Sequence, residues 1–209
     1  MRRRILLSDG SMPPAQYEYV DLGLPSGLKW ANMNIGATSP EDYGGYFSWG
    51  NIEPHFSSDK QNIDDGYSFD STNYALTSGS QLPGDIPSND AQYDAALAIF
   101  GSGSRLPKTD DFYELKINTD YEYTTINGIE CTKFMKKDDH SVYILVPSAS
   151  YVSGTKIYQS TYSNRYGYYT TSTRHNIYYA KFYLTGHIYT VLETYGSRSQ
   201  GVPIRAVHD

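Results

Sequence analysis

The amino-acid sequence predicts an α+β fold in which two helices pack on a small antiparallel sheet with long loops. Three observations lead to this class. The length of 209 residues suits one domain that can bury a core of its own. Two short segments, one from Asp90 to Phe100 and one beginning at Thr109, have apolar residues at helical spacing. After Thr124 apolar and polar residues alternate, and turn residues separate the runs.

The first helix is expected between Asp90 and Phe100. Ser88 or Asn89 can cap its start, and Gly101 is suited to end it. The residues expected to share its inner face are Tyr93, Ala96, Leu97 and Phe100.

The second helix is expected to follow Thr109, which can act as its N-cap. Asp110 and Asp111 then lie at the positive end of the helix dipole, where negative charge is favourable. Phe112 and Leu115 would face inward, and residues 101–107 would form a tight connector between the two helices.

The strands of the C-terminal half are expected at residues 141–146, 177–184, 187–194 and 202–207. Pro147 ends the first, and a turn at Gly186 separates the second from the third. In the second strand Tyr178, Ala180, Phe182 and Leu184 would share one face, with Tyr179, Lys181 and Tyr183 on the other. This alternation favours an antiparallel meander.

Two regions lie outside this pattern. In residues 1–16 three arginines precede only three apolar residues, fewer than the ~7–15 that a secretory signal needs. We expect either an arm that docks on another chain or a solvated terminus, with the domain proper at 17–209. Asn51 to Pro87 has little periodicity, and loops of this length are usually functional or mobile.

The overall charge and the cysteine content exclude several classes of protein. Seventeen Lys and Arg against 23 Asp and Glu leave a net charge of −6 without a basic stripe, which argues against a nucleic-acid partner. No apolar run approaches the ~20 residues of a membrane span. The single Cys131 excludes an intrachain disulfide and a multi-cysteine zinc site.

Three blocks of the sequence resemble the FISUMP, or major paralogous, domain family of gut anaerobes and their phages. The first is Tyr19 to Ala31 with Asn34 to Ala37, Tyr46-Phe47 and Trp49-Gly50. The second is Asn89-Asp90-Ala91, Arg105-Leu106-Pro107 and Glu114-Leu115. The third is Leu145 to Tyr151, Gly167 to Thr173 and Gly201 to Val207. The resemblance implies a C-type lectin-like fold, distantly similar to formylglycine-generating enzymes and to variable proteins of diversity-generating retroelements.

The chain departs from the family at three aromatic positions. Phe100 and Ser104 stand where the family has Trp, and Tyr169 takes the place of a core Trp. These changes leave the expected fold intact, but they indicate a diverged branch whose ligand cannot be transferred.

The residues predict no enzyme, no cofactor and no metal site. Glu53-Pro54-His55 lies in the wrong place for the calcium loop of such lectins, and one cysteine cannot supply the pair that formylglycine-generating relatives need. The five His residues lack metal-ligand spacing, and Gly101-Ser-Gly-Ser lacks the Lys of a phosphate loop. We expect structural roles for Arg105 and Arg205, and core positions for Cys131, Trp30 and Trp49.

Tyrosine is the unusual feature of the composition. Eleven of the 22 Tyr residues lie between Tyr151 and Tyr195, among Ser, Thr, Asn and Gly. This is the composition of antibody combining loops, but Tyr also fills β positions in half-buried sheets. The candidate ligand-binding residues are Tyr158, Tyr162, Asn164, Arg165, Tyr166, Tyr168, Arg174, His175, Asn176, Tyr179, Lys181 and Tyr183. About half of them should pack inward, because strands alternate.

Three functions remain open from the sequence. The first is a non-enzymatic binding protein on a phage virion, which recognises a bacterial surface glycan or protein while the N-terminal arm docks on other virion proteins. The second is a structural virion component, a head fibre or capsid decoration, whose Tyr patch is a homo-oligomer interface. The third is a bacterial surface adhesin or lipoprotein. None of them involves nucleic acid or insertion into a membrane.

Overall fold

The computed structural model of the chain describes residues 17–57, 63, 66–71, 74, 82–158, 166–176, 179–186 and 192–209. Within these ranges the protein is mostly β-strand with two short helices, which confirms the α+β class. Neither of these helices is long and apolar enough to cross a membrane. The arm expected at residues 1–16 lies outside the described ranges.

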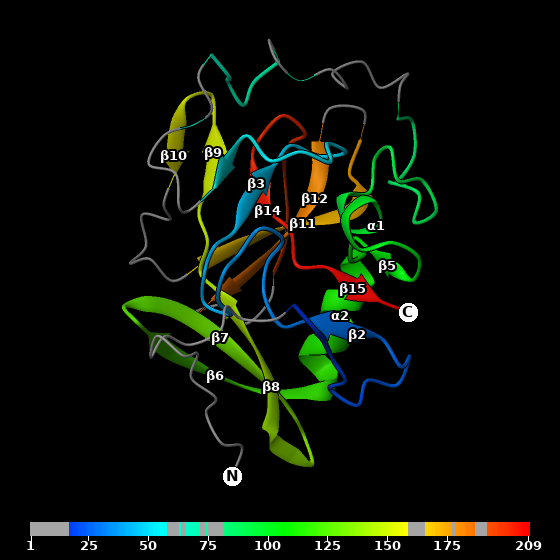
Figure 1. Ribbon diagram of the computed structural model, residues 1–209, viewed down its shortest axis with the longest axis vertical. Helices are drawn as coiled ribbons and strands as arrows, with labels where there is room; N and C mark the ends of the chain where they lie inside the picture. Colours follow the sequence, from blue (N-terminus) through cyan, green and yellow to red (C-terminus); the bar gives the residue numbers. More distant parts are fainter. Residues whose placement is uncertain are drawn as a thin grey trace, which may run out of the picture.

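The elements follow one another along the chain as Figure 1 labels them. The helices are α1 (Ala95–Phe100) and α2 (Thr109–Asn118). The strands are β1 (Tyr19–Val20), β2 (Lys29–Ala31), β3 (Gly45–Phe47), β4 (Phe56–Ser57), β5 (Ser104–Arg105), β6 (Thr119–Ile126), β7 (Ile129–Lys136), β8 (Asp139–Pro147), β9 (Tyr151–Ser153), β10 (Lys156–Tyr158), β11 (Tyr166–Arg174), β12 (Tyr179–Gly186), β13 (Leu192–Ser197), β14 (Val202–Pro203) and β15 (Val207–His208).

Two three-stranded antiparallel meanders dominate the sheet structure, β6-β7-β8 and β11-β12-β13. An antiparallel meander is present in the C-terminal half, but its composition differs from the prediction. Its first strand, β11, is not among the predicted strands, and the strand predicted at 141–146 belongs to the preceding meander. The strand predicted at 177–184 is β12, which continues to Gly186, so the turn predicted at Gly186 is wrong: this glycine pairs with Tyr166. β6 begins directly after α2, five residues before the expected change of pattern at Thr124. Asn127 and Gly128 form the β6–β7 turn with φ angles of +51° and +83°, the left-handed conformations that a tight hairpin turn needs.

The third predicted strand of the C-terminal half is displaced. β13 spans Leu192–Ser197 rather than 187–194, and residues 187–191 lie outside the described ranges. The strand predicted at 141–146 is confirmed within β8.

The strand predicted at residues 202–207 is wrong, because two separate strands stand there. β14 pairs with β3, whereas β15 pairs with β2 on one side and β5 on the other. Between them the Ile204 carbonyl accepts a bond from Ile35 N–H, which turns the chain from one sheet to the next. In Figure 1 the red β15 consequently lies beside the blue β2, so both ends of the domain meet in one sheet.

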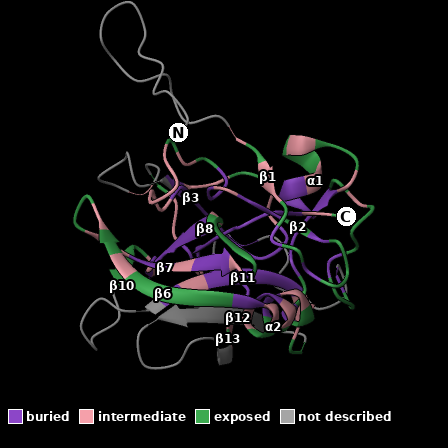
Figure 2. Cartoon of the chain, turned by 90° about the horizontal axis from the view of Figure 1, so that it is seen from below, coloured by how far each residue is buried: buried purple, intermediate pink, exposed green. Residues whose placement is uncertain are grey.

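The core consists of two main clusters of buried side chains, one around each helix. Trp49 belongs to the cluster around α1, and Trp30 and Tyr169 belong to the cluster around α2. All three are at most 1% exposed, which confirms their predicted core positions. Figure 2 shows buried residues concentrated along β7, β8 and β11, while β6 is largely exposed at the rim.

Helix α1 starts later than predicted. Neither Ser88 nor Asn89 is its cap, since the helix begins at Ala95 and Asp94 is the N-cap. The Asp94 carboxylate accepts bonds from the N–H groups of Ala96 and Leu97, which local sequence rules would allow. It also accepts one from Leu106 N–H, a bond that depends on the fold. The predicted stop at Gly101 is confirmed, with a φ of +82°.

Helix α2 begins at Thr109 itself, so Thr109 is not the cap. The preceding residue, Lys108, donates its backbone N–H to the Asp111 carboxylate at 2.6 Å. Lys108 is the N-cap and Asp111 is the third residue of the helix, so this bond is the one that the third-residue side chain of a capping box makes back to the N-cap amide. Phe112 and Leu115 are fully buried, as predicted.

The region from Asn51 to Pro87, which showed no sequence pattern, contributes buried side chains where it is described. Phe69, Tyr74, Leu82 and Ile86 are all at most 5% exposed. Phe69 also pairs through its backbone with Gly154, at the tip of the β9–β10 hairpin. Those parts of the segment therefore belong to the core.

Candidate functional site

The β9–β10 hairpin carries the first group of candidate residues. Tyr158 stacks on Tyr151, with ring centres 5.2 Å apart and planes 5° from parallel. Tyr168 of β11 meets the Tyr151 ring edge-on at 4.9 Å. Tyr158 remains 42% exposed, so the outermost ring of this group faces solvent.

The amino-acid order explains why this hairpin forms. Tyr151-Val152-Ser153 and Lys156-Ile157-Tyr158 alternate in character around a two-residue loop that begins with Gly154. Gly154 has a φ of +58°, which favours glycine. Val152 is fully buried, and Tyr151 and Tyr158 lie on the opposite face of the hairpin. On that face Tyr151 is half-buried and packs against the core cluster around α1, whereas Tyr158 is exposed.

A second aromatic pair lies beyond the other end of β11. His175 stacks on Tyr195 of β13, with ring centres 4.4 Å apart and planes 6° from parallel. Tyr195 is 60% exposed, and His175 and the adjacent Asn176 are exposed as well.

Arg198 ties the loop of this second pair to the core. Its guanidinium carbon lies 4.3 Å from the centre of the Trp49 ring. One terminal nitrogen donates to the Leu82 carbonyl at 3.1 Å, and the other donates to the Asn176 carbonyl at 2.7 Å. Burial lowers the pKa of Arg198 from its ordinary value, because water is removed from the charge. This arginine therefore joins three distant segments beneath the exposed residues 175–176.

Residues 82–87 border the same loop. Asp85 accepts a bond from Arg174 N–H at 3.0 Å, and Ile86 N–H donates to the Ser172 carbonyl at 2.8 Å. This part of the patternless region thus fixes the backbone that leads into His175.

The two aromatic pairs are separate contact points. Tyr168 and His175 are seven residues apart on one strand and its extension, which is at most about 23 Å of extended chain. The actual separation is shorter than this bound, because a bulge interrupts β11 between Thr170 and Arg174.

The structure places the predicted site residues in four groups. Tyr158, His175 and Asn176 are exposed; Tyr168 and Arg174 are half-buried, with Tyr168 packed against the core around α1. For Tyr166, Tyr179, Lys181 and Tyr183 the backbone is described: they pair in register with Gly186, Ser197, Tyr195 and Tyr169, respectively. Tyr162, Asn164 and Arg165 lie outside the described residues.

Four residues of these surfaces were missed by the sequence reasoning: Tyr151, Ser153, Lys156 and Tyr195. The first three could have been found from the two-residue Gly-Thr loop, whose flanking alternation predicts a hairpin with one outward face. Tyr195 carried no such signal, because its stacking partner His175 comes from another part of the chain.

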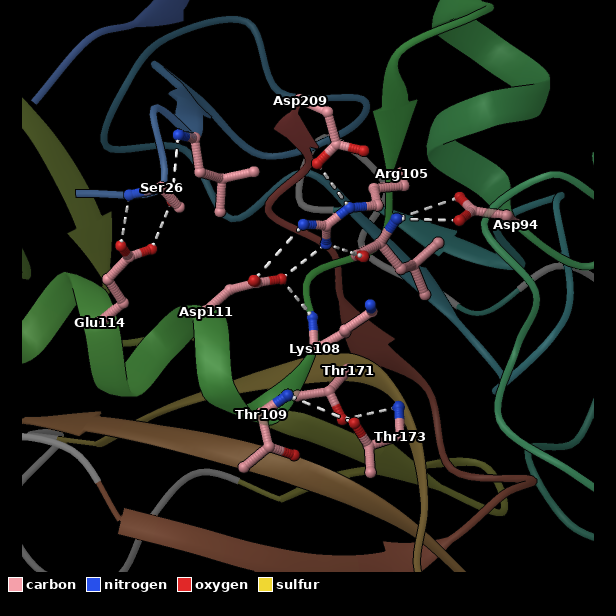
Figure 3. A network of polar contacts seen from close by, with 12 residues as sticks. Ser26, Asp94, Arg105, Lys108, Thr109, Asp111, Glu114, Thr171, Thr173 and Asp209 are labelled. Carbon is pink, nitrogen blue, oxygen red and sulfur yellow. Dashed lines mark hydrogen bonds and ion pairs between the residues drawn. The ribbon is translucent and has the colours of Figure 1, made fainter. Parts of the chain in front are cut away.

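The buried charged groups have structural partners. Figure 3 shows Arg105 between Asp111 and Asp209, at 2.6 Å and 3.0 Å, with Asp94 nearby on the backbone of Leu106. Arg205 donates to the carbonyls of Ala31 and Leu145. Carboxylate or backbone-carbonyl partners were predicted for Arg105 and Arg205, and this is confirmed.

The buried cysteine and the possible metal ligands show no reactive arrangement among the described residues. Cys131 is 2% exposed in β7, as predicted, and burial raises the pKa of its thiol from 9.0 to about 12. In the described part of the chain, no group of three or more His, Cys, Asp or Glu side chains is arranged to hold a metal ion. The arrangement presents exposed rings and polar groups, which suits binding.

Comparison with known proteins identifies no relative of this chain. The chain matches no model of a known protein family, and searches of curated proteins and of solved structures return no significant match.

Proposed function

We propose that this protein is a non-enzymatic binding protein with a C-type lectin-like fold, displayed on a phage virion. It recognises a glycan or protein on the bacterial surface through the exposed residues of the β9–β10 hairpin and of the His175–Tyr195 pair. The N-terminal arm, residues 1–16, attaches it to other virion proteins.

The exposure of two stacked aromatic pairs carries this proposal. Tyr158 and Tyr195 are 42% and 60% exposed although each is stacked on a second ring. Stacking reduces the number of conformations that a ring loses on binding, so less entropy opposes the complex. Tyr is also among the residues that dominate interface energies.

Two further observations support binding over catalysis and display over secretion. The buried Asp94, Arg105 and Cys131 are engaged in capping, pairing and packing, respectively. The FISUMP family occurs in gut anaerobes and their phages. The resemblance to it supports a C-type lectin-like fold and a location on the virion.

Binding of the labelled, purified protein to intact gut-anaerobe cells tests the proposal. We expect saturable binding to at least one strain, which is lost when the surface polysaccharides or proteins of that strain are removed. The double variant Tyr158→Ser/Tyr195→Ser should bind at least about 30-fold more weakly, because an interface hot spot contributes ~2 kcal/mol or more.

Tyr143→Ser is the matched control. Tyr143 is 44% exposed on β8 and interacts with Lys133, away from both aromatic pairs. Loss of binding in this control would show that the two pairs are not special. A folded protein that binds no strain would overturn the proposal and favour a structural virion component, whose oligomer should dissociate when Tyr158 and Tyr195 become Asp.

A further inference from the structure

We propose that the outward face of the β9–β10 hairpin binds a sugar ring that carries a carboxylate, as in a uronic-acid-containing polysaccharide. This inference rests on the proposed binding function and names the class of ligand that one of its two contact points takes.

The hairpin register places four side chains on this face. Tyr151 is opposite Tyr158, and Ser153 is opposite Lys156. Directly opposed residues share a face of a sheet, and the alternate residue Val152 is buried on the other side. On β10, Lys156 and Tyr158 therefore share one face and are both exposed, and Ile157 between them lies on the other face, where it is 44% exposed.

Within the part of the chain that the structure describes, the polar groups of these four side chains have no protein partner. The hydroxyls of Tyr151, Ser153 and Tyr158 make no hydrogen bond to any described residue. No carboxylate of the described residues pairs with Lys156. By contrast, Lys133, on β7, is paired with Glu122 at 2.8 Å. The hairpin face thus combines an exposed ring with a lysine that no carboxylate of the described residues neutralises.

The ring favours a sugar. Tyr158 is stacked in parallel on Tyr151, so one of its faces is covered by Tyr151 and the other is turned away. The face of an aromatic ring is electron-rich and attracts the weakly positive C–H groups that one side of a pyranose presents. The three hydroxyls nearby can exchange hydrogen bonds with those of the sugar.

The cation favours an acidic sugar. Lys156 lies two residues from Tyr158 on the same face, which is about 6.6 Å along a strand. The flexible four-carbon stem of lysine spans that distance to a carboxylate on a ring lying over Tyr158. A neutral sugar would leave this charge without a partner.

A glycan array tests the inference directly. The array holds polysaccharide fragments that contain glucuronic, galacturonic or mannuronic acid, each beside its carboxyl-reduced counterpart. We expect binding to at least one acidic fragment, and about three- to fivefold weaker binding to its reduced form, since an exposed ion pair contributes up to ~1 kcal/mol.

Variants separate the ring from the charge. Tyr158→Ala should weaken binding about 30-fold, whereas Tyr158→Phe keeps the stacking face and should remain within threefold of the wild type. Lys156→Gln should remove the preference for the acidic form, and Lys156→Arg should keep it. Tyr143→Ala and an unchanged thermal unfolding midpoint control for folding.

The outcomes distinguish this inference from the proposed function. Binding to no acidic fragment, or an acid preference that survives Lys156→Gln, would overturn the inference. If intact cells are still bound in either case, the proposed function stands and its ligand is a protein or a neutral glycan. If the acidic fragments are bound but no cells are, the proposed function fails instead.

Discussion

At the scale of single residues, the three buried arginines differ in what surrounds them. Arg105 has the carboxylates of Asp111 and Asp209, which outweigh its burial and raise its pKa. Arg198 and Arg205 have carbonyl partners, and burial lowers the pKa of both. Arg198 also covers the Trp49 ring. Its shape is therefore as important as its charge.

Arg198→Lys tests this point. A lysine keeps the charge but cannot reach the Leu82 and Asn176 carbonyls together or lie flat on Trp49. We expect the free energy of unfolding to fall by about 2–3 kcal/mol, as for the loss of hydrogen bonds to a charged group. Denaturant titration measures it. Arg174→Lys, at a half-buried position, is the control and should change stability by less than ~0.5 kcal/mol; equal effects of both changes would contradict the assignment.

At the scale of elements, one carboxylate holds α1 in place. α1 has only six residues, too few to be stable alone, and Asp94 satisfies two of its first N–H groups. The third bond, from Leu106 N–H, attaches the helix start to the strand end that follows it. The helix and the following connector therefore depend on the same side chain.

Asp94→Ala should destabilise the protein by more than an ordinary cap does. A lost N-cap costs ~1 kcal/mol, and the Leu106 amide would in addition be left buried without a partner, at ~1–3 kcal/mol. We expect about 2–4 kcal/mol in total by urea unfolding. Asp110→Ala, a change at an exposed position in the first turn of α2, should lower the free energy of unfolding by only about a few tenths of a kcal/mol. A loss of only ~1 kcal/mol for Asp94→Ala would show that the Leu106 bond is unimportant.

At the scale of the whole molecule, burial makes the fold sensitive to alkali. It raises the pKa of the Cys131 thiol and of the phenols of Tyr46, Tyr74 and Tyr169. Each group therefore keeps its proton to higher pH in the folded state than in the unfolded state. Their full contribution to stability is present below the unfolded pKa values of 9.0 and 10.0, and it is lost as the pH rises above them.

The free energy of unfolding should accordingly be level from about pH 7 to 8 and fall steadily from about pH 9 upward. Urea titrations at one-unit steps, with tyrosinate absorbance near 295 nm as a second signal, measure this. Tyrosinate of the buried phenols should appear together with unfolding. Stability that stays constant to pH 11 would contradict the burial of these groups.

The amino-acid sequence by itself determined the features that depend on neighbours in the chain. The α+β class, the stop of α1 at Gly101 and the inward face of α2 follow from local spacing and turn chemistry. The core positions of Trp30 and Trp49 follow from size and polarity, because large apolar groups leave water wherever the fold allows it. That of Tyr169 was implied by the family resemblance alone. These predictions needed no knowledge of which segments meet.

Tertiary structure alone decided the features that require distant segments to pair. Residues 202–207 alternate like one strand, yet they divide between two sheets because β3 and β2 offer separate edges. Asp94, and not Ser88 or Asn89, caps α1, and its carboxylate accepts a third backbone N–H, that of Leu106, which only the fold brings near. The stacking of His175 on Tyr195 and the span of Arg198 depend on contacts between residues far apart in sequence. The propensity of a residue for helix or strand depends only on its neighbours in the chain and does not include such contacts. The sequence could therefore predict that Tyr residues gather in the C-terminal region, but not that they form two exposed aromatic pairs.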